Sequence, residues 1–396
     1  MKNYIDIFDC YAGCGGLSAG FMNEGYKIKY ANEIDENFAS TYLSYHSDTI
    51  MFNEDINDVI QKIQDKEKGY PSSGEIDMVI GGPPCQGFSG FNRYRDISDN
   101  RNSQIENYYK IIELLVPQCY VMENVSGILS LEKGEAVKKI YSKSEKLGYV
   151  IKLGVLQAGY YGLPQNRWRV FLVAYKNRDF DFRFPYPTHN FPKIGAYETK
   201  GFRSNVIRPI GGGLNLFEDP LSKVTVYDAI SDLPELKMND KYEGPYLVEP
   251  KSKYQEEIRC GSNGIHNHET QRAEEITISR INALPDKKNA GWYDLPIELQ
   301  PKNLKKRNAK DYPNRFGRLE WDGIFNTIVG KIEPYWSRVI HPEQKRLISI
   351  RECARAQGLP DSMIFNGTFY QQIKQVGNAV PVPLAAKLAK SIKNLF

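Results

Sequence analysis

Residues 4–18 read YIDIFDCYAGCGGLS, and this stretch decides the fold that we expect. Tyr4–Phe8 is an apolar run with the length of a buried strand, and Leu17–Asn23 has the spacing of a helix. The glycines between them permit a tight turn and a close approach of the backbone to a ligand, and the helix N-terminus that follows favours negative charge. Although such turns are common, this order is typical of the start of a parallel α/β sheet.

The alternation of short apolar runs and helical patterns continues to about residue 174. It predicts a doubly wound, mostly parallel sheet with crossover helices, which is a Rossmann-like α/β fold. Further strands are expected at Ile28–Asn32, Met78–Gly81, Cys119–Glu123 and Val170–Tyr175, and helices at Glu36–Ser44, Gln104–Leu115, Gly134–Lys146, Ile348–Gln357 and Pro383–Ile392.

The composition and pattern of the sequence change after about residue 178. Prolines at 185, 187, 192 and 209 and the glycine run 211–213 replace the regular alternation, and helical patterns return only near residue 348. We therefore expect an irregular domain at residues 179–338, inserted into an α/β domain made of residues 1–178 and 339–396.

The bulk composition excludes several classes of protein. With 396 residues, 41% of them hydrophobic, the chain can bury a full core. The net charge of +4 is too small to indicate a nucleic-acid partner, although it does not oppose one. Six scattered cysteines without a CxxC pair favour a reducing compartment and argue against structural zinc. No apolar run approaches a membrane span, so we expect no membrane partner and a cytoplasmic protein, or a nuclear one in a eukaryote.

Two acidic residues indicate what the glycine turn binds. Glu33 ends the second expected strand, about 20 residues after the turn, where its carboxylate can accept hydrogen bonds from both hydroxyls of a ribose. Asp55 ends the next segment, where it can hold an adenine amino group. Together these residues predict a cofactor that contains adenosine.

A cysteine lies on a loop directly after the expected strand Met78–Gly81, in the segment GGPPCQGFS at residues 81–89. A lone cysteine is usually a small, inert core residue. Here the flanking prolines and glycines leave Cys85 no core face, and the carboxyl end of a parallel strand is where such sheets place their chemistry. We therefore predict that Cys85 is a nucleophile whose thiolate is formed by its surroundings.

Charged residues end two further strands. Glu123, in Met122-Glu123-Asn124-Val125, is either a paired structural carboxylate or a buried proton donor, and the sequence leaves both readings open. Arg167 and Arg169 alternate in Gln165-Asn166-Arg167-Trp168-Arg169, so we expect them on one face of a strand, as a clamp for carboxylates or phosphates or as a solvated edge.

Two other features are given their simpler interpretation. His266 and His268 form a short pair without a third ligand at suitable spacing, so we expect no metal site. The basic run that includes Lys302, Lys305 and Lys306 is usually a solvated face, although within an insert it can contact phosphates.

Six segments, taken in order, resemble the motif set of the cytosine-5 DNA methyltransferases, and a chance occurrence of all six in this order is implausible. They are Asp9–Gly16, Asn32-Glu33, Pro83–Gln86, Glu123–Val125, Gln165–Arg169 and Gln375–Pro381. Gly317–Gly323 and Arg351–Arg355 look similar to the catalytic domain of the animal maintenance methyltransferases. The match covers both ends of the chain and skips the insert.

The resemblance implies an S-adenosylmethionine-dependent methyltransferase fold, with S-adenosylhomocysteine as the cofactor product, no metal, and residues 179–338 as a target-recognition domain for double-stranded DNA. It places Tyr11, Ala12, Gly13, Gly15, Gly16, Glu33, Ile34, Asp55, Ile56, Pro83, Asn378 and Val380 on the cofactor, and Gln86, Ser89, Thr327 and Ile328 on the DNA. Two positions depart from the pattern: Gln104 stands where the family has a leucine against the adenine, and Tyr11 replaces a phenylalanine.

The implied reaction is methylation of carbon 5 of a cytosine that has flipped out of the duplex. Cys85 would add to carbon 6, and Glu123 would hydrogen-bond or protonate N3. Arg167 would orient this end of the pocket, with Arg169 as the second arginine of the segment, and Asn124 would brace it.

Three alternatives remain. An RNA cytosine-5 methyltransferase would use the same chemistry, but the long insert and the lack of a Cys-Phe-Thr segment argue against it. A catalytically silent DNA-binding relative would have no chemical reason to keep Cys85, Glu123 and both arginines. A nicotinamide-dependent oxidoreductase would leave the proline-cysteine loop unexplained. We expect a monomeric modification enzyme of a restriction-modification system, whose endonuclease would share the target sequence without binding the methyltransferase.

Overall fold

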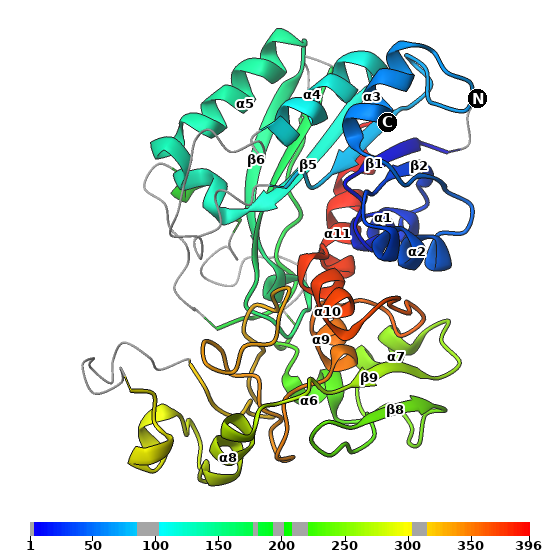
Figure 1. Ribbon diagram of the computed structural model, residues 1–396. Coiled ribbons are helices and arrows are strands. Elements are labelled where there is room, and N and C mark those ends of the chain that lie inside the picture. The colour runs from blue at the N-terminus through cyan, green and yellow to red at the C-terminus, as the bar shows by residue number, and fades with distance from the viewer. Residues whose placement is uncertain (1–3, 85–102, 177–180, 193–201, 208–220, 303–314) are drawn as a thin grey trace. The chain divides into compact units, whose positions relative to one another are not determined.

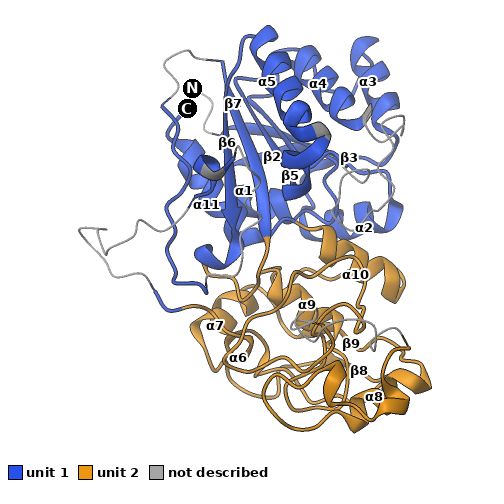
Figure 2. Cartoon of the chain, turned by 90° about the vertical axis from the view of Figure 1, so that its left-hand side faces the viewer, with its two compact units in different colours: residues 1–161, 168–222, 380–396 blue, residues 162–167, 223–379 orange. Residues whose placement is uncertain are grey.

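The computed structural model describes residues 4–84, 103–176, 181–192, 202–207, 221–302 and 315–396. The chain forms two compact units, shown in different colours in Figure 2. Unit 1 contains residues 1–161, 168–222 and 380–396, and unit 2 contains residues 162–167 and 223–379. These bounds differ from the domain boundaries expected from the sequence, because residues 339–379 cluster with the insert and most of 179–222 clusters with the sheet.

The described residues of unit 1 form a seven-stranded sheet with the order β3-β2-β1-β4-β5-β7-β6 (Figure 1). The strands are β1 (Asp6–Cys10), β2 (Lys27–Asn32), β3 (Ile50–Phe52), β4 (Met78–Gly81), β5 (Cys119–Val125), β6 (Val150–Gln157) and β7 (Trp168–Tyr175). The first five strands pair in parallel, and β7 runs antiparallel to both β5 and β6. The expectation of a doubly wound, mostly parallel α/β fold is confirmed.

Helices cover both faces of this sheet because the side chains of a strand alternate between the faces. The helices are α1 (Gly16–Asn23), α2 (Glu36–Tyr45), α3 (Ile56–Gln64), α4 (Ser103–Leu115), α5 (Glu135–Lys146) and α11 (Val382–Lys393). Phe8 and Cys10 of β1 join a core cluster with α3, α4 and α5. Asp9 points to the opposite face, where it accepts a hydrogen bond from Ser18 of α1, and α11 packs against α1.

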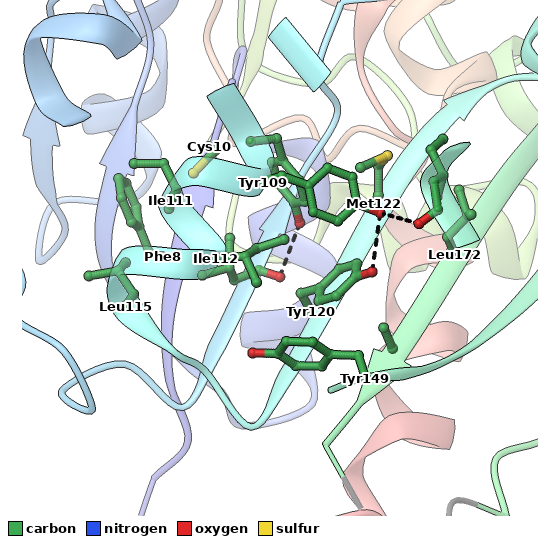
Figure 3. Packing of buried hydrophobic residues seen from close by; sticks show 14 of the residues in the cluster. Phe8, Cys10, Tyr109, Ile111, Ile112, Leu115, Tyr120, Met122, Tyr149 and Leu172 are labelled. Carbon is green, nitrogen blue, oxygen red and sulfur yellow. Dashed lines mark hydrogen bonds between the residues drawn. The ribbon is translucent and has the colours of Figure 1, made fainter. Parts of the chain in front are cut away.

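The core cluster combines aliphatic side chains with tyrosines whose hydroxyls are satisfied inside it (Figure 3). Tyr109 and Tyr120 share the hydroxyl of Ser144, and Tyr109 also donates to the carbonyl oxygen of Ile140 at 3.1 Å. Because each buried hydroxyl has a partner, these rings contribute apolar area without leaving an unpaired polar group. The sheet is thus a rigid support for the loops at the carboxyl ends of its strands.

Unit 2 is less regular, as the sequence predicts for the insert. Its helices are α6 (Val226–Ile230), α7 (Lys253–Arg259), α8 (Glu275–Ala283), α9 (Ile350–Ala356) and α10 (Phe369–Asn378), and its strands are β8 (Lys241–Gly244) and β9 (Ile265–Glu269). No helix among the residues described for either unit is long and apolar enough to cross a membrane.

Buried ion pairs organise unit 2 around α9. Arg355 is fully buried and pairs with Asp232 and with Asp361, whose carboxylates lie on other segments. Arg346 contacts both carboxylate oxygens of Glu352 at 2.9 and 2.7 Å. Removing one partner of such a pair would leave an uncompensated buried charge, which is strongly destabilising. The Arg351–Arg355 segment therefore stabilises the fold of unit 2.

Candidate active site

The glycine turn after β1 has a backbone conformation that residues with a side chain rarely adopt. Gly13 and Gly15 have φ values of 59° and 90°, in the left-handed region. A Cβ atom at Gly15 would lie 2.4 Å from the ring of His46, so no larger residue fits there. Gly15 is also the N-cap of α1 and offers no side-chain cap. The side chain of the N-cap residue therefore does not occupy the N-terminus of α1, where an electronegative group of a ligand is favoured.

Glu33 closes the turn and keeps capacity for a ligand. Its Oε2 accepts the amide of Gly13 at 2.9 Å, and its Oε1 accepts the amide of Asp35 at 2.9 Å. Burial raises the pKa of Glu33, and these two hydrogen bonds counteract that effect. Each carboxylate oxygen has a second lone pair, so Glu33 can still accept two hydroxyl groups. Next to it, the side chain of Ile34 is 64% exposed, an apolar surface suited to a flat ring.

The neighbouring candidates differ in what they can reach. Asp55 caps α3 through Oδ1, which accepts the amide of Asn57 at 2.8 Å, whereas Ile56 is 4% exposed and belongs to the core cluster. The side chain of Ile56 is therefore committed to the core. Tyr11 has a φ of 58°, and its hydroxyl donates to the backbone oxygen and to Oε1 of Gln104, at 3.0 and 2.9 Å. The two residues that depart from the family pattern thus bond to each other.

A buried carboxyl group behind the turn was not singled out from the sequence. Asp9 accepts the hydroxyl of Ser18 at 2.6 Å, and Ser18 shares a hydrogen bond with Tyr42. Burial, with a smaller contribution from the charge of Glu33, raises the pKa of Asp9 to about 7. The position of Asp9, at the end of a strand and directly before the glycine turn, could have identified it from the sequence.

At the ends of β4 and β5 the structure brings together a carboxylate, an arginine and the start of the cysteine loop. Nε of Arg169 lies 2.8 Å from Oε1 of Glu123, and both side chains are nearly buried. A Cβ atom at Gly82 would lie 3.2 Å from Oε2 of Glu123, so the carboxylate lies against the backbone that leads to residue 85. Burial lowers the pKa of Arg169, and the Glu123 carboxylate counteracts this. Glu123 is therefore paired with Arg169 through one of its two carboxyl oxygens.

Asn124 connects the same two strands. Its Nδ2 donates to the carbonyl oxygen of Pro83 at 3.2 Å, and its Oδ1 accepts the amide of Val125 at 2.9 Å. Both ends of this amide are therefore used, and the side chain can hold Pro83 in one position relative to β5. Cys85, Gln86 and Ser89 lie outside the described residues.

The sequence assigned the orienting role at this carboxylate to Arg167, and the structure corrects that assignment. The guanidinium in ion-pair contact with Glu123 is that of Arg169. Arg167 is fully buried in unit 2, where it donates to the backbone oxygens of Ile328, Gly377 and Ala379 at 2.7–3.0 Å. The expected alternation fails because β7 begins at Trp168, so Arg167 precedes the strand.

Three of the four remaining candidates belong to unit 2, and Val380 belongs to unit 1. Thr327 is exposed and donates its hydroxyl to the backbone oxygen of Asn166, whereas Ile328 is buried and its amide donates to Gln165. Asn378 ends α10 in unit 2 and is exposed, and Val380 in unit 1 is 8% exposed. Of these, Thr327 and Asn378 present accessible polar side chains.

The histidine pair has structural partners. His268 is buried between the hydroxyl of Ser349 and the backbone oxygen of Pro234, at 2.8 and 2.9 Å. In the parts of the chain that the structure describes, no group of three or more histidine, cysteine or acidic side chains is arranged to hold a metal ion.

A family model described as "C-5 cytosine-specific DNA methylase" matches residues 5–394. The chain belongs to this methylase family. The rice DNA (cytosine-5)-methyltransferase 1A (Oryza sativa subsp. japonica) is 31% identical to this chain over an alignment of 438 positions that covers 99% of this chain and 28% of the relative. DNA (cytosine-5)-methyltransferase 1 of Gallus gallus is 31% identical over an alignment of 461 positions that covers 98% of this chain and 30% of the relative.

This methylase chain therefore spans less than a third of the length of those relatives. Solved structures share its fold at greater sequence distance. A putative DNA modification methyltransferase encoded within an E. coli prophage has a TM-score of 0.69 at 24% identity, with 99% of both chains covered. The Entamoeba histolytica methyltransferase EhMeth has a TM-score of 0.53 at 16% identity.

Proposed function

We propose that this chain transfers a methyl group from S-adenosylmethionine to carbon 5 of cytosine in double-stranded DNA, with Cys85 as the covalent nucleophile. One observation carries the proposal. In a member of the DNA methylase family, the Glu123–Arg169 ion pair and the Asn124–Pro83 hydrogen bond hold a carboxylate beside the backbone that leads to Cys85.

The glycine turn fits the adenosine part of the cofactor. Glu33 would accept the ribose hydroxyls, Ile34 would contact the adenine, and the free oxygen of Asp55 would accept the adenine amino group. Tyr11, locked by Gln104, would form a wall of the adenine pocket. The remaining proposed contacts are Ala12, Gly13, Gly15, Gly16, Pro83, Asn378, Val380 and the backbone of Ile56. When bound, this cofactor supplies an electrophilic methyl group and leaves as S-adenosylhomocysteine.

Carbon 5 of cytosine is a poor nucleophile until a group adds to carbon 6. The Cys85 thiolate would form that bond, and Glu123, in its protonated form, would donate a hydrogen bond or its proton to N3, so that the negative charge developing in the ring is neutralised. Arg169 would position Glu123, and Asn124 would position Pro83 and the loop after it. Carbon 5 then takes the methyl group, and loss of its proton expels the thiolate.

The cysteines that the structure describes do not compete for this role. Cys10, Cys14, Cys119 and Cys353 are buried, and burial raises the pKa of each thiol, that of Cys14 to about 12. A thiol that stays protonated is a weak nucleophile. Cys260 is exposed on unit 2, far in the sequence from Glu123 and Arg169, and it provides a matched control.

The target cytosine must leave the helix to reach Cys85, at a cost of roughly a few kcal/mol that protein–DNA contacts must offset. Gln86, Ser89, Thr327 and Ile328 are the contacts we propose, with unit 2 as the target-recognition part. We propose further that the enzyme is a monomeric, cytoplasmic modification enzyme of a restriction-modification system, with an endonuclease that shares its target sequence.

The test is methyl transfer from tritiated S-adenosylmethionine to duplex DNA. Cys85→Ala is expected to abolish transfer, and Cys260→Ala to leave it unchanged. Glu123→Gln is expected to lower turnover by roughly 10²-fold or more while cofactor binding is retained. Duplex DNA with 5-fluorocytosine at the target should leave the protein covalently attached through Cys85 when the cofactor is present.

Substantial transfer by Cys85→Ala would overturn the proposal, as would near-normal turnover of Glu123→Gln. Transfer to total tRNA in place of duplex DNA would show that RNA is the substrate.

A further inference from the structure

Unit 2 contains a cavity of about 260 Å³ to which four aromatic side chains contribute. Trp292, Phe316, Tyr335 and Trp336 contribute rings, and Arg280 and Gln271 contribute polar groups. The volume falls just below the range of roughly 300–1,000 Å³ that is typical of pockets for drug-sized ligands. It therefore suits a single planar ring system better than a whole cofactor.

The four rings form a row of contacts in which one pair is stacked, one is tilted and one meets edge to face. Trp292 and Phe316 lie parallel with centroids 4.1 Å apart, Trp292 and Tyr335 are 5.1 Å apart, and Tyr335 and Trp336 are 4.8 Å apart. Trp292 and Phe316 are nearly completely buried, whereas Trp336 is 49% exposed. The row of rings thus runs from the interior of unit 2 to its surface, and the ring of Trp336 is accessible to a ligand.

Two arginines beside the rings limit the kind of ligand that the cavity can bind. The guanidinium of Arg280 lies 5.3 Å from the Trp292 ring centroid, and that of Arg315 lies 4.6 Å from the Trp336 ring centroid. A cage for a methylated ammonium group would keep its ring faces free for the cation, whereas here guanidinium groups already contact two of the rings. Of the lining residues that the structure describes, the one carboxylate, that of Glu333, is paired with Lys331. A neutral planar ring can stack on the aromatic side chains and accept hydrogen bonds from a guanidinium.

The guanidinium group of Arg280 is positioned to donate hydrogen bonds to a ring in the cavity. Its Nε donates to the backbone oxygen of Leu299 at 2.9 Å, which fixes the guanidinium against the ring. Among the described residues its Nη groups make no hydrogen bond within the protein. Gln271, on the same cavity, offers an amide with both donor and acceptor atoms. Nucleobases present such donor and acceptor edges around an aromatic plane.

We propose that this cavity binds an unstacked nucleobase of the DNA, a second base besides the cytosine that is methylated. The inference rests on the proposed function for its substrate, but it concerns a site in unit 2, whereas Glu123 and Arg169 lie in unit 1. A base held here would anchor unit 2 on DNA by stacking, without a demand for one base identity.

The experiment measures the binding of a labelled 20-base-pair duplex that carries one bulged thymine, and of the fully paired duplex, by fluorescence anisotropy. The wild-type protein is expected to bind the bulged duplex more tightly. Trp336→Ala is expected to weaken that binding about tenfold, in line with the loss of one base–aromatic stack. Trp336→Phe should restore most of it, and Arg280→Gln should weaken it severalfold.

Tyr293→Ala is the matched control, because Tyr293 neighbours Trp292 and is 41% exposed but does not line the cavity. It should bind as the wild type does. Thymidine monophosphate should quench the tryptophan fluorescence of the wild type, and much less that of Trp336→Ala.

Equal binding of both duplexes, or unchanged binding by folded Trp336→Ala and Arg280→Gln, would overturn the inference. If the wild type still methylates duplex DNA, the proposed function survives that outcome. If it does not methylate DNA, the proposed function fails, and quenching by the mononucleotide still decides whether the cavity binds a base.

Discussion

At the level of single residues, two arginines separated by one position perform different tasks. Arg169 forms an ion pair with Glu123 in unit 1, and Arg167 joins three backbone carbonyl oxygens in unit 2. A guanidinium has five donors in a fixed plane, so it can bridge several carbonyl groups, whereas an ammonium group cannot reproduce that geometry. Arginine-to-lysine substitutions therefore separate the two tasks.

We predict that Arg169→Lys lowers the turnover of methyl transfer by roughly 10²-fold, because Glu123 is no longer held in place. The melting temperature should change by no more than a few degrees. Arg167→Lys should instead lower the free energy of unfolding of unit 2 by about 2–3 kcal/mol, because buried carbonyl oxygens lose their donors.

The measurements are single-turnover kinetics and denaturant unfolding of both variants. If Arg167→Lys stays as stable as the wild type but loses turnover, the positioning role belongs to Arg167 after all.

At the level of elements, α1 and α11 are in unusually close contact. A Cβ atom at Gly20 of α1 would lie 2.3 Å from the Cβ of Ala385 and 2.7 Å from the backbone nitrogen of Ala386 on α11. The hydroxyl of Tyr26, just after α1, donates to the backbone oxygen of Ala389. The absence of a side chain at Gly20 therefore sets the distance between the two helices.

Gly20→Ala is predicted to destabilise unit 1 by about 1–3 kcal/mol, since the added methyl group must push two backbones apart. This cost exceeds the gain in helix propensity of about 1 kcal/mol. Thermal unfolding followed by circular dichroism measures the change. Lys387→Ala, on the exposed face of α11, is the control and should be nearly neutral. A stabilised Gly20→Ala variant would show that the helices can separate freely.

The strands with continuous apolar runs could be predicted from the sequence, and others could not. β4 was predicted at its observed bounds, and β1, β2, β5 and β7 to within two residues at either end. β3 has three residues, which is too short for a pattern. β6 contains Gly154, and glycine weakens a strand pattern. A Cβ atom there would lie 2.7 Å from the ring of Phe184, a packing requirement that only the fold reveals.

Helix α3 was not predicted, although its sequence has a clear helical pattern. Ile56, Val59, Ile60 and Ile63 follow helical spacing, and all four are buried after the cap at Asp55. The pairing of Glu123 with Arg169 had no such signal, because it depends on the register of β5 against β7, in which Val125 lies opposite Arg169 and Glu123 opposite Phe171. Register between strands distant in sequence is a property of the assembled sheet.

At the level of the whole molecule, buried ionisable groups make the stability of each unit depend on pH. Burial raises the pKa of Asp9 in unit 1 to about 7 and lowers the pKa of His341 in unit 2 to about 4. Nδ1 of His341 accepts the amides of Glu343 and Gln344, so a proton there would break two hydrogen bonds. Burial also lowers the pKa of His268.

Between pH 4 and 7, folded unit 1 keeps a proton on Asp9 that the unfolded chain releases, so Asp9 lowers the stability of unit 1 as pH rises. Burial lowers the pKa of His46 in the same unit to about 4, so His46 lowers the stability of unit 1 as pH falls, and the two contributions oppose each other. In unit 2 the unfolded chain takes up protons on His341 and His268, so this unit loses stability as pH falls from about 6.5 toward 4. We predict that His341 alone costs unit 2 about 2 kcal/mol at pH 5 relative to pH 8.

Hydrogen exchange of α9 and of β1, corrected for the intrinsic rate at each pH, measures the two slopes separately. His341→Gln should flatten the slope in unit 2, whereas Asp9→Asn should make unit 1 lose stability as pH falls, because His46 is then unopposed. A pH profile of unit 1 that Asp9→Asn leaves unchanged would contradict the assignment.

The main chain passes between the two units four times, at residues 161/162, 167/168, 222/223 and 379/380. Tyr26 and its partner Ala389 are 363 positions apart in the sequence. On the ribosome, α1 is therefore synthesised long before the helix that covers it. Until α11 has emerged, the apolar face of α1 around Leu17 and Phe21 has no cover, which makes it a binding target for chaperones during translation.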